Sequence, residues 1–340
     1  MISRKKILII CPDDTVSYVH TDIALTGEVF DVDMVTLREF RVLKKPSLIA
    51  MVFWKFLWTQ VDLVCLRFSI PAYAPFVVLL SKLFGKKVVI ITNGFDVTFV
   101  PDTGFGEMGS WWKRLFQSIA LRYSDVVLPP SDYSKTEVLQ YGRPKMITTL
   151  YDGIDTDYFA PNPHIVREEM VMTVAAAVAH YSMSTKGVVT LIAVAKAMPD
   201  IQFVIVGRVL DDAKDEVAKT GKNVLFVGRL SDEALLQYYQ RAKVYAQLSR
   251  HEAFGVANVE AMSSGCASVV TPVTALPEIV GNAGLYVPFG DVAASVIAIR
   301  EALKRDDLRE AARSHVLDRF TLAHRKQGLV SNFMRLIDAH

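Results

Sequence analysis

Two glutamates eight positions apart, Glu252 and Glu260, are the side chains whose type and spacing first suggest a binding site. Between them, Ala253-Phe254-Gly255 predicts a turn into a helix that begins near Val256 and ends near Gly265, where glycine suits a left-handed C-cap. Glu252 then lies on a loop and Glu260 inside the helix, roughly 7 Å along its axis from Gly255. The N–H groups of the first turn have no partner within the helix and can bind negative charge. Two carboxylates and a helix start at this spacing could hold opposite ends of a sugar diphosphate.

This segment resembles the E-x7-E signature of retaining glycosyltransferases that have two Rossmann domains (the GT-B fold), family four in particular. The resemblance continues, in the family's order, through residues 269–271, 275–280 and 284–288. It implies that Glu260 accepts hydrogen bonds from the ribose diol of a nucleotide-sugar and that Glu252 accepts them from the hydroxyls of the donor sugar. The alternative, two merely solvated carboxylates, suits an isolated pair better than a pair inside this run.

A lysine and a glycine, Lys186-Gly187, match the place where the family usually has an arginine and a lysine that clamp the diphosphate. The arginine is missing, because His180, Tyr181 or Ser182 occupies its region, and Arg208 or Arg229 is the candidate replacement. A short helix after the loop 271–276 is expected to direct free N–H groups at the β-phosphate, with Pro277 at its start. The resemblance implies Lys186 and Glu252 as catalytic residues, no metal ligand, and donor-binding residues at Glu260, Phe254, Gly255, Val256, Arg229, Gly187, Ala275 and Leu276.

In the first half of the chain, residues 90–96 end a predicted strand in a turn with small residues. The family often has a histidine where this sequence has Asn93, so Asn93 or Asp96 is expected to bond the donor sugar in its place. Gly94 lies between them, and a long loop then leads to Trp111 and Trp112. The tryptophans could stack on a sugar or lipid acceptor, or they could anchor the next helix in the core. These five residues are the candidates for the cleft and the acceptor.

Apolar runs that read as strands alternate with helical patterns, which is typical of parallel sheets with crossover helices. The candidate strands of the first half are residues 6–11, 32–36, 62–66, 87–92, 125–128 and 145–150. The fold class is therefore α/β, and the resemblance implies two Rossmann-like domains facing a cleft. The expected domains are an acceptor domain at 1–160, a donor domain at 161–320 and a C-terminal helix at 321–340 that returns to the first domain.

Length and composition agree with this organisation. The chain has 340 residues, of which 51% are apolar, so two domains with sizeable cores are possible. A formal net charge of +2 gives no argument for a nucleic-acid partner. Three scattered cysteines suggest a reducing compartment and no disulfide framework. The start of the chain reads as a strand rather than a signal peptide, and no long apolar run predicts a membrane span. We therefore expect a cytoplasmic protein.

One stretch, residues 47–58, is apolar almost all round. The simpler interpretation is a helix buried against the first sheet. The alternative is a helix that lies on a membrane surface, since enzymes of the resembling family often act at the membrane face on lipid-linked acceptors. In that case the protein would be peripheral at the inner face of the membrane.

The resemblance implies metal-independent transfer of a sugar, with retention, from a UDP- or GDP-sugar to a hydroxyl of a glycan or lipid-linked acceptor. The nucleotide-sugar is a substrate, so no cofactor is expected. Two other functions stay open, because a fold does not determine a function. One is a nucleotide-sugar epimerase or hydrolase of the same fold. The other is an inactive donor-binding subunit, which the missing histidine and arginine would explain.

Overall fold

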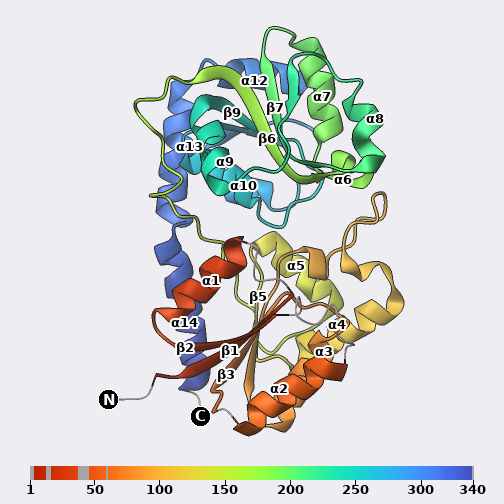
Figure 1. Ribbon diagram of the computed structural model, residues 1–340, viewed down its shortest axis with the longest axis vertical. Coiled ribbons are helices and arrows are strands. Elements are labelled where there is room, and N and C mark those ends of the chain that lie inside the picture. Colours follow the sequence, from red (N-terminus) through yellow and green to blue (C-terminus); the bar gives the residue numbers. More distant parts are fainter. Residues whose placement is uncertain (1–3, 13–16, 37–45, 59, 339–340) are drawn as a thin grey trace. The chain divides into compact units, whose positions relative to one another are not determined.

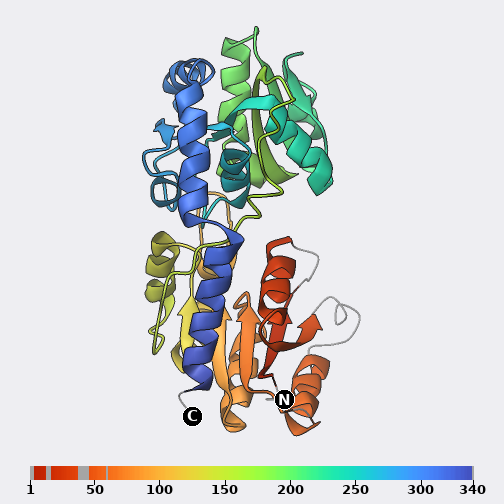
Figure 2. The ribbon, with the colours of Figure 1, turned by 90° about the vertical axis from the view of Figure 1, so that its left-hand side faces the viewer.

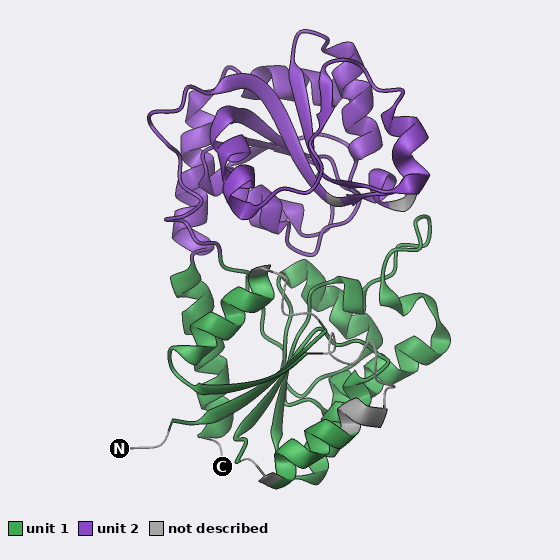
Figure 3. Cartoon of the chain, in the orientation of Figure 1, with its two compact units in different colours: residues 1–153, 322–340 green, residues 154–321 purple. Residues whose placement is uncertain are grey.

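The computed structural model describes residues 4–12, 17–36, 46–58 and 60–338, without the side chains of residues 17, 46–49, 58, 176, 180 and 181 (Figure 1). The chain forms two compact units (Figure 3). Unit 1 comprises residues 1–153 and 322–340, and unit 2 comprises residues 154–321. The first crossing between units thus follows Gly153 and precedes the domain boundary that we expected after residue 160.

The sheet of unit 1 has five parallel strands in the order β2-β1-β3-β4-β5. These are β1 (Lys6–Cys11), β2 (Asp31–Thr36), β3 (Leu63–Arg67), β4 (Lys87–Ile91) and β5 (Val126–Leu128). The predicted strand at 145–150 is wrong, because only Ile147 bridges to Val127 there. The Leu150 N–H still bonds to the carbonyl of Pro129, but Pro129 has no N–H to complete a second bridge, and the Leu150 carbonyl accepts from Arg325 of the last helix.

Helices cover both faces of this sheet (Figures 1 and 2). One face carries α1 (Ser17–Gly27) and α14 (Leu322–Ile337), and the other carries α2 (Pro46–Trp58), α3 (Ala74–Leu83), α4 (Trp111–Tyr123) and α5 (Asp132–Tyr141). Side chains alternate along a strand, so in β1 Ile7 and Ile9 join the α1–α14 core while Leu8 and Ile10 join the opposite core. The return of the C-terminal helix to the first domain is confirmed.

A buried arginine fastens α14 to unit 1. Arg325 donates Nε and Nη2 to the two carboxylate oxygens of Asp22 at 2.9 and 2.7 Å, and Nη1 to the carbonyls of Leu150 and Tyr151 at 2.7 and 3.0 Å. Burial alone would raise the pKa of Asp22, but the guanidinium groups of Arg325 and Arg67 outweigh it and lower that pKa. The pair therefore joins α1, α14 and the segment that leads out of unit 1.

The sheet of unit 2 has six parallel strands in the order β11-β10-β9-β6-β7-β8. They are β6 (Glu168–Val178), β7 (Gln202–Val209), β8 (Val224–Phe226), β9 (Ala242–Gln247), β10 (Ala267–Val270) and β11 (Gly284–Tyr286). From β6 the chain builds outward through β7 and β8, then returns to the other side of β6 with β9. This reversal is a topological switch point, and ligands of open α/β sheets bind beyond the carboxyl ends of the strands at such a point. In unit 1 the corresponding point lies between β1 and β3.

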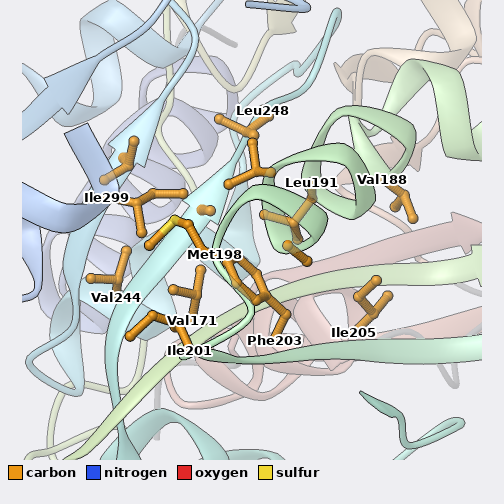
Figure 4. Close-up of a cluster of buried hydrophobic side chains, with 14 of the residues drawn as sticks. Val171, Val188, Leu191, Met198, Ile201, Phe203, Ile205, Val244, Leu248 and Ile299 are labelled. Carbon is orange, nitrogen blue, oxygen red and sulfur yellow. The ribbon is translucent and has the colours of Figure 1, made fainter. Parts of the chain in front are cut away.

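The helices of unit 2 lie on both faces of its sheet. They are α6 (His180–Thr185), α7 (Val188–Ala197), α8 (Lys214–Val217), α9 (Asp232–Arg241), α10 (Val256–Ser263), α11 (Leu276–Val280), α12 (Val292–Ala302) and α13 (Asp306–Arg319). Leu191 of α7 and Ile299 of α12 pack with Phe203 and Val244 of the sheet in one core (Figure 4). Tyr239 of α9 and side chains of α10 belong to the core on the opposite face. The two rigid layers support the loops at the carboxyl ends of the strands.

Candidate functional site

The predicted catalytic pair meets at the switch point of unit 2. Lys186 lies in the connection after β6 and Glu252 in the loop after β9, and these two strands are neighbours. The ammonium Nζ of Lys186 donates to Oε1 and Oε2 of Glu252 at 2.8 and 2.9 Å. The Glu252 side chain is 8% exposed and that of Lys186 is 30% exposed. The structure thus brings the two residues together where a ligand of this sheet would bind, and their catalytic role stays a prediction.

Neutral groups also hold Glu252. Its Oε1 accepts hydrogen bonds from Gln247 Nε2 and from Ser249 Oγ, both at 2.8 Å. Its backbone N–H donates to Thr274 Oγ1 at 2.9 Å, and the Thr274 hydroxyl donates back to the Glu252 carbonyl at 2.9 Å. Thr274 has a φ of +52°, a left-handed conformation that a threonine rarely adopts. In the part of the chain that the structure describes, Oε1 therefore has three donors and Oε2 has only Lys186.

The glycine after Lys186 is required by a close approach of two backbones. Gly187 has a φ of +69°, and a Cβ atom built on it would lie 1.9 Å from the carbonyl oxygen of Leu248. Only glycine permits this contact, which sets the start of α7 directly against the end of β9. The Lys-Gly pair in the sequence therefore has a structural reason: the glycine brings the lysine within reach of Glu252.

The helix that was predicted to begin near Val256 and to contain Glu260 is confirmed as α10. Gly255 is its N-cap with a φ of +95°, the helix ends at Ser263, and Gly265 follows with a φ of +82°. Glu260 Oε2 accepts a hydrogen bond from the Tyr239 hydroxyl at 3.0 Å. Burial raises the pKa of Glu260 to about 8, because the apolar surroundings disfavour the charged carboxylate more than the tyrosine hydroxyl favours it. Near neutral pH the free protein thus holds Glu260 mainly in its protonated form.

Backbone donors near the pair are only partly those that we expected. Within the described residues, Val256 N–H and Ala257 N–H at the start of α10 have no hydrogen-bond acceptor. By contrast, the prediction of free N–H groups at the second short helix is wrong for Ala275 and Leu276. Ala275 N–H bonds to the Glu252 carbonyl at 3.3 Å, and Leu276 N–H bonds to Val273 at 3.1 Å, because the loop after β10 folds back on the Glu252 loop. Donor binding by Ala275 and Leu276, both fully buried, stays a prediction.

Two arginines lie at the carboxyl ends of β7 and β8. Arg208 and Arg229 are exposed, and neither forms an ion pair with another described residue. The N–H of Gly207 donates to the carbonyl of Gly228 at 2.8 Å, which keeps the two strand ends together. Ser182, one of the residues in the family's arginine region, uses its hydroxyl within its own helix start, on Ala177 and Ala179. The side chains of His180 and Tyr181 lie outside the described residues.

In unit 1, the turn after β4 is fixed by a buried carboxylate. Asp96, which is 0% exposed, accepts hydrogen bonds from the N–H groups of Ser69 and Asn93 at 2.8 and 2.9 Å. Burial raises its pKa. Asn93 accepts from Nη1 of Arg67 at 2.8 Å through its Oδ1, so its amide nitrogen points elsewhere. Of the two residues proposed to replace the family's histidine, Asp96 is therefore occupied by backbone groups, and partly exposed Asn93 is the better candidate. Gly94 adopts a φ of +94° in the same turn.

The paired tryptophans are on the surface at the start of α4. Trp111 is 76% exposed and Trp112 is 38% exposed, so the alternative in which both anchor the core is wrong. Trp112 contacts Phe116 edge to face, with ring centroids 6.0 Å apart, and Lys113 Nζ lies 5.7 Å from its ring centroid. Their aromatic faces thus remain available to a ligand or a surface.

Sequence reasoning missed three residues of these sites. Gln247 and Tyr239 contact the two glutamates, and Arg67 orients Asn93. A glutamine inside an otherwise apolar strand and an arginine at the end of another were visible signals, since buried polar groups need partners. Tyr239 gave no such signal, because it reads as an ordinary core residue of an amphipathic helix.

Comparison with known proteins agrees with this geometry. The profile of a family described as "Glycosyl transferases group 1" matches residues 168–316, nearly all of the unit that contains Lys186, Glu252 and Glu260. Unit 2 belongs to the group 1 glycosyl transferases.

Several relatives of this chain are named as mannosyltransferases. It is 39% identical over 89 residues to O-antigen chain mannosyltransferase B of Escherichia coli, a match that covers 26% of this chain and 23% of the relative. It is 28% identical over 166 residues to the phosphatidyl-myo-inositol mannosyltransferase of Mycolicibacterium smegmatis, covering 46% and 43%. It is 24% identical over 226 residues to the GDP-mannose:cellobiosyl-diphosphopolyprenol alpha-mannosyltransferase of Xanthomonas oryzae, covering 64% and 57%. The chain thus spans less than two thirds of the length of these relatives.

Solved structures show the same fold along almost the whole chain. A sucrose-phosphate synthase from Thermosynechococcus elongatus superposes with a TM-score of 0.80 at 17% identity, covering 99% of this chain and all of that one. Anabaena HepE, in a complex with UDP and glucose, gives 0.77 at 19% identity, covering 97% and 100%. The chain thus has the two-domain α/β GT-B fold that the sequence predicted.

Proposed function

We propose that this protein is a metal-independent retaining glycosyltransferase that moves a hexose from a nucleotide-sugar to an acceptor hydroxyl. The observation that supports this best is the Lys186–Glu252 ion pair at the switch point of unit 2. The proposed reaction requires a lysine that can reach the diphosphate and a carboxylate that can reach the sugar hydroxyls. Lys186 and Glu252, which have this chemistry, lie side by side. Glu260, one helix further along the chain, is the candidate partner of the ribose diol.

Each group has a distinct task in this proposal. Lys186 turns from Glu252 to the diphosphate and, with Arg208 or Arg229 and the free N–H groups of α10, stabilises the departing phosphate. Preorganised donors of this kind are typically worth about 3–4 kcal/mol each in the transition state. Glu252 accepts hydrogen bonds from the hydroxyls of a sugar that develops oxocarbenium character. The leaving phosphate takes the acceptor proton, so no nucleophile from the protein is needed.

The donor that we propose is GDP-mannose, because three of the relatives described above are named as mannosyltransferases and one name includes GDP-mannose. UDP-glucose is the alternative, since HepE was crystallised with UDP and glucose at much lower identity. A thermal-shift screen of GDP, UDP and their sugars decides between them. A ligand present at a hundred times its Kd stabilises the folded protein by about 2.7 kcal/mol.

Turnover is then tested with the preferred donor in the presence of EDTA, with and without a panel of acceptors. Transfer in EDTA that falls strongly in Glu252→Gln, but not in Glu310→Gln on the exposed side of α13, supports the proposal. Free sugar or an epimer formed without acceptor supports the hydrolase or epimerase. Nucleotide binding with no product from any acceptor supports the inactive subunit. Full activity of Glu252→Gln would contradict the role of this residue.

The acceptor is proposed to be lipid-linked, since the names of two relatives specify lipid substrates. Unit 1 has a surface that suits a membrane, formed by α2, α3 and α4, which lie side by side (Figure 1). The helix predicted at 47–58 is half buried: α2 buries Val52 and Phe56 but exposes its other face. The exposed large apolar side chains of this surface are Phe53, Trp54, Leu57, Phe76, Leu79, Leu83, Trp111, Trp112 and Leu115. Patches of this kind usually mark an interaction site.

Charge favours an anionic lipid surface as the partner. Residues 46–58, 74–87 and 111–123 contain seven lysines and arginines and no acidic residue. Some are paired with acids from elsewhere, such as Lys55 with Asp33 at 2.6 Å and Lys113 with Glu107 at 2.6 Å, which leaves an excess of positive charge. Within the described residues, no helix combines the length and the apolarity needed to cross a bilayer. Contact through the surface of unit 1 is therefore the form of membrane association that we propose.

Sedimentation with vesicles tests this contact. The protein is expected to bind vesicles that contain phosphatidylglycerol more strongly than pure phosphatidylcholine vesicles. Trp54→Ser combined with Leu83→Ser should reduce binding, whereas Leu317→Ser, an exposed leucine of unit 2, should not. Equal binding of both variants, or no binding to either vesicle, would contradict the membrane role and leave the transferase proposal intact.

A further inference from the structure

A chain of buried hydrogen bonds runs along the end of β9 and terminates on Glu252. The Tyr245 hydroxyl donates to Gln247 Oε1 at 2.9 Å, and Gln247 Nε2 donates to Ser249 Oγ at 2.6 Å and to Glu252 Oε1 at 2.8 Å. Ser249 in turn donates to the same carboxylate oxygen at 2.8 Å. Gln247, Tyr245 and Ser249 are at most 2% exposed.

The network fixes the orientation of the Gln247 amide. The Tyr245 hydroxyl accepts from the N–H of Val174 on the neighbouring strand β6 at 3.2 Å, so its own proton is directed at Gln247 Oε1. With its oxygen bound in this way, the amide must direct its two protons at Ser249 and Glu252. A buried amide left without these bonds would be costly, and this one has a partner for each proton.

The same network distinguishes the two oxygens of Glu252. Among the described residues, Oε1 accepts from Lys186, Gln247 and Ser249, whereas Oε2 accepts only from Lys186. Lys186 is the most exposed of these partners and has the flexible side chain expected of a group that moves. When Lys186 turns toward a phosphate, Oε2 becomes free for a ligand hydroxyl, and Gln247 and Ser249 alone hold the carboxylate in place.

We propose that Gln247 is a positioning residue for Glu252, which it holds on the sugar hydroxyls while Lys186 is engaged by the diphosphate. This inference rests on the proposed function. Gln247 does not itself touch the ligand. It holds Oε1 of Glu252 by a hydrogen bond, so that the free oxygen Oε2 faces the sugar. Its effect should therefore appear in recognition of the sugar and in the rate of transfer, with little effect on binding of the nucleotide.

Three variants separate this role from a packing role. Gln247→Met keeps the length of the side chain but removes both donors, and Gln247→Glu keeps its shape but replaces the donor with an acceptor. Gln240→Met is the matched control, because Gln240 lies in the same unit and donates one hydrogen bond to the carbonyl of Ala160 at 2.8 Å. Thermal unfolding of each variant shows whether it is folded before it is assayed.

Calorimetric titration with GDP and GDP-mannose, or with UDP and UDP-glucose, gives the first readout. We expect Gln247→Met and Gln247→Glu to bind the nucleoside diphosphate within about threefold of the wild type and to lose the further affinity that the sugar contributes. The second readout is transfer, where kcat should fall about 10- to 100-fold, as for loss of one hydrogen bond to a charged group. Gln240→Met should change neither readout.

The two readouts also separate this inference from the proposed function. A wild type that transfers no sugar can still bind the nucleotide-sugar more tightly than the nucleoside diphosphate. If Gln247→Met then loses this difference in affinity, the positioning role is supported and the transferase function is not. If Gln247→Met retains both the gain and kcat, the positioning role is overturned while the transferase stands. Equal losses of affinity for diphosphate and nucleotide-sugar would also overturn it, because they would indicate a general disturbance of the loop.

Discussion

The raised pKa of Glu260 makes stability depend on pH in a way that one substitution can isolate. The ordinary pKa of a glutamate is 4.5, and burial raises that of Glu260 to about 8. The folded protein therefore binds this proton more tightly than the unfolded chain does. Stability from this group is fully present below about pH 4.5 and is lost as the pH rises through 8. Glu260→Gln replaces the partly buried acid with a neutral side chain that can still accept the hydrogen bond from Tyr239.

The size of the effect follows from the two pKa values. Between pH 5 and 8 the unfolded chain releases the proton and the folded protein mostly retains it, so wild-type stability falls by about 1.4 kcal/mol per pH unit from this group. Over that range the stability of Glu260→Gln relative to the wild type should rise by about 3–4 kcal/mol. For a domain of this size that corresponds to a change of about 2–4 °C in Tm for each kcal/mol.

Scanning calorimetry of wild type and Glu260→Gln at several pH values measures this difference. All four tryptophans lie at positions 54–112, within unit 1, so their fluorescence would not report on unit 2. Effects of other titrating groups cancel in the difference, because both proteins contain them. A difference in stability that stays constant from pH 5 to 8 would refute the raised pKa of Glu260.

Three further changes test other parts of the structure. Gly187→Ala should lower Tm and abolish activity, because its Cβ would lie 1.9 Å from a backbone oxygen; calorimetry with an unchanged Tm would contradict this contact. Arg325→Met should cost about 3–5 kcal/mol in urea unfolding, because buried Asp22 keeps only Arg67 as its partner and the carbonyls of Leu150 and Tyr151 lose their donor, whereas Lys326→Met, at an exposed pair on the same helix, should cost about 1 kcal/mol or less. Lys186→Met should weaken binding of nucleoside diphosphates at least tenfold in calorimetric titration with a smaller loss of Tm than Arg325→Met, since the buried Glu252 keeps its hydrogen bonds from Gln247 and Ser249.

Local patterns were sufficient to predict much of the scaffold. Apolar periodicity predicts the parallel strands of unit 1 other than 145–150. Glycine at helix ends predicts the helix between Gly255 and Gly265. These features depend on neighbours in the chain, whose interactions are the same in any fold. For the same reason the order of Lys186, Glu252 and Glu260 along the chain could suggest a site before any distance was known.

Local patterns failed where a partner comes from a distant segment. The stretch 145–150 has the composition of a strand, but the residue of the neighbouring segment that it meets after Val127 is Pro129, which has no N–H, and the ladder ends at one bridge. Likewise the short helix after Thr274 seemed to offer free N–H groups, and the fold turns that of Ala275 toward the carbonyl of Glu252. Neither outcome depends on the local sequence alone.

By itself, then, the sequence determined the order of the secondary structure, the family of unit 2 and the chemical groups of its site. Only the tertiary structure decided what those groups contact: Lys186 paired with Glu252, Gln247 bonded to the same carboxylate, and partly buried Glu260 bonded to Tyr239. The physical reason is that charge, proton affinity and donor orientation depend on the surroundings of a side chain. Those surroundings arise from strands and helices that are neighbours in space and not in the chain.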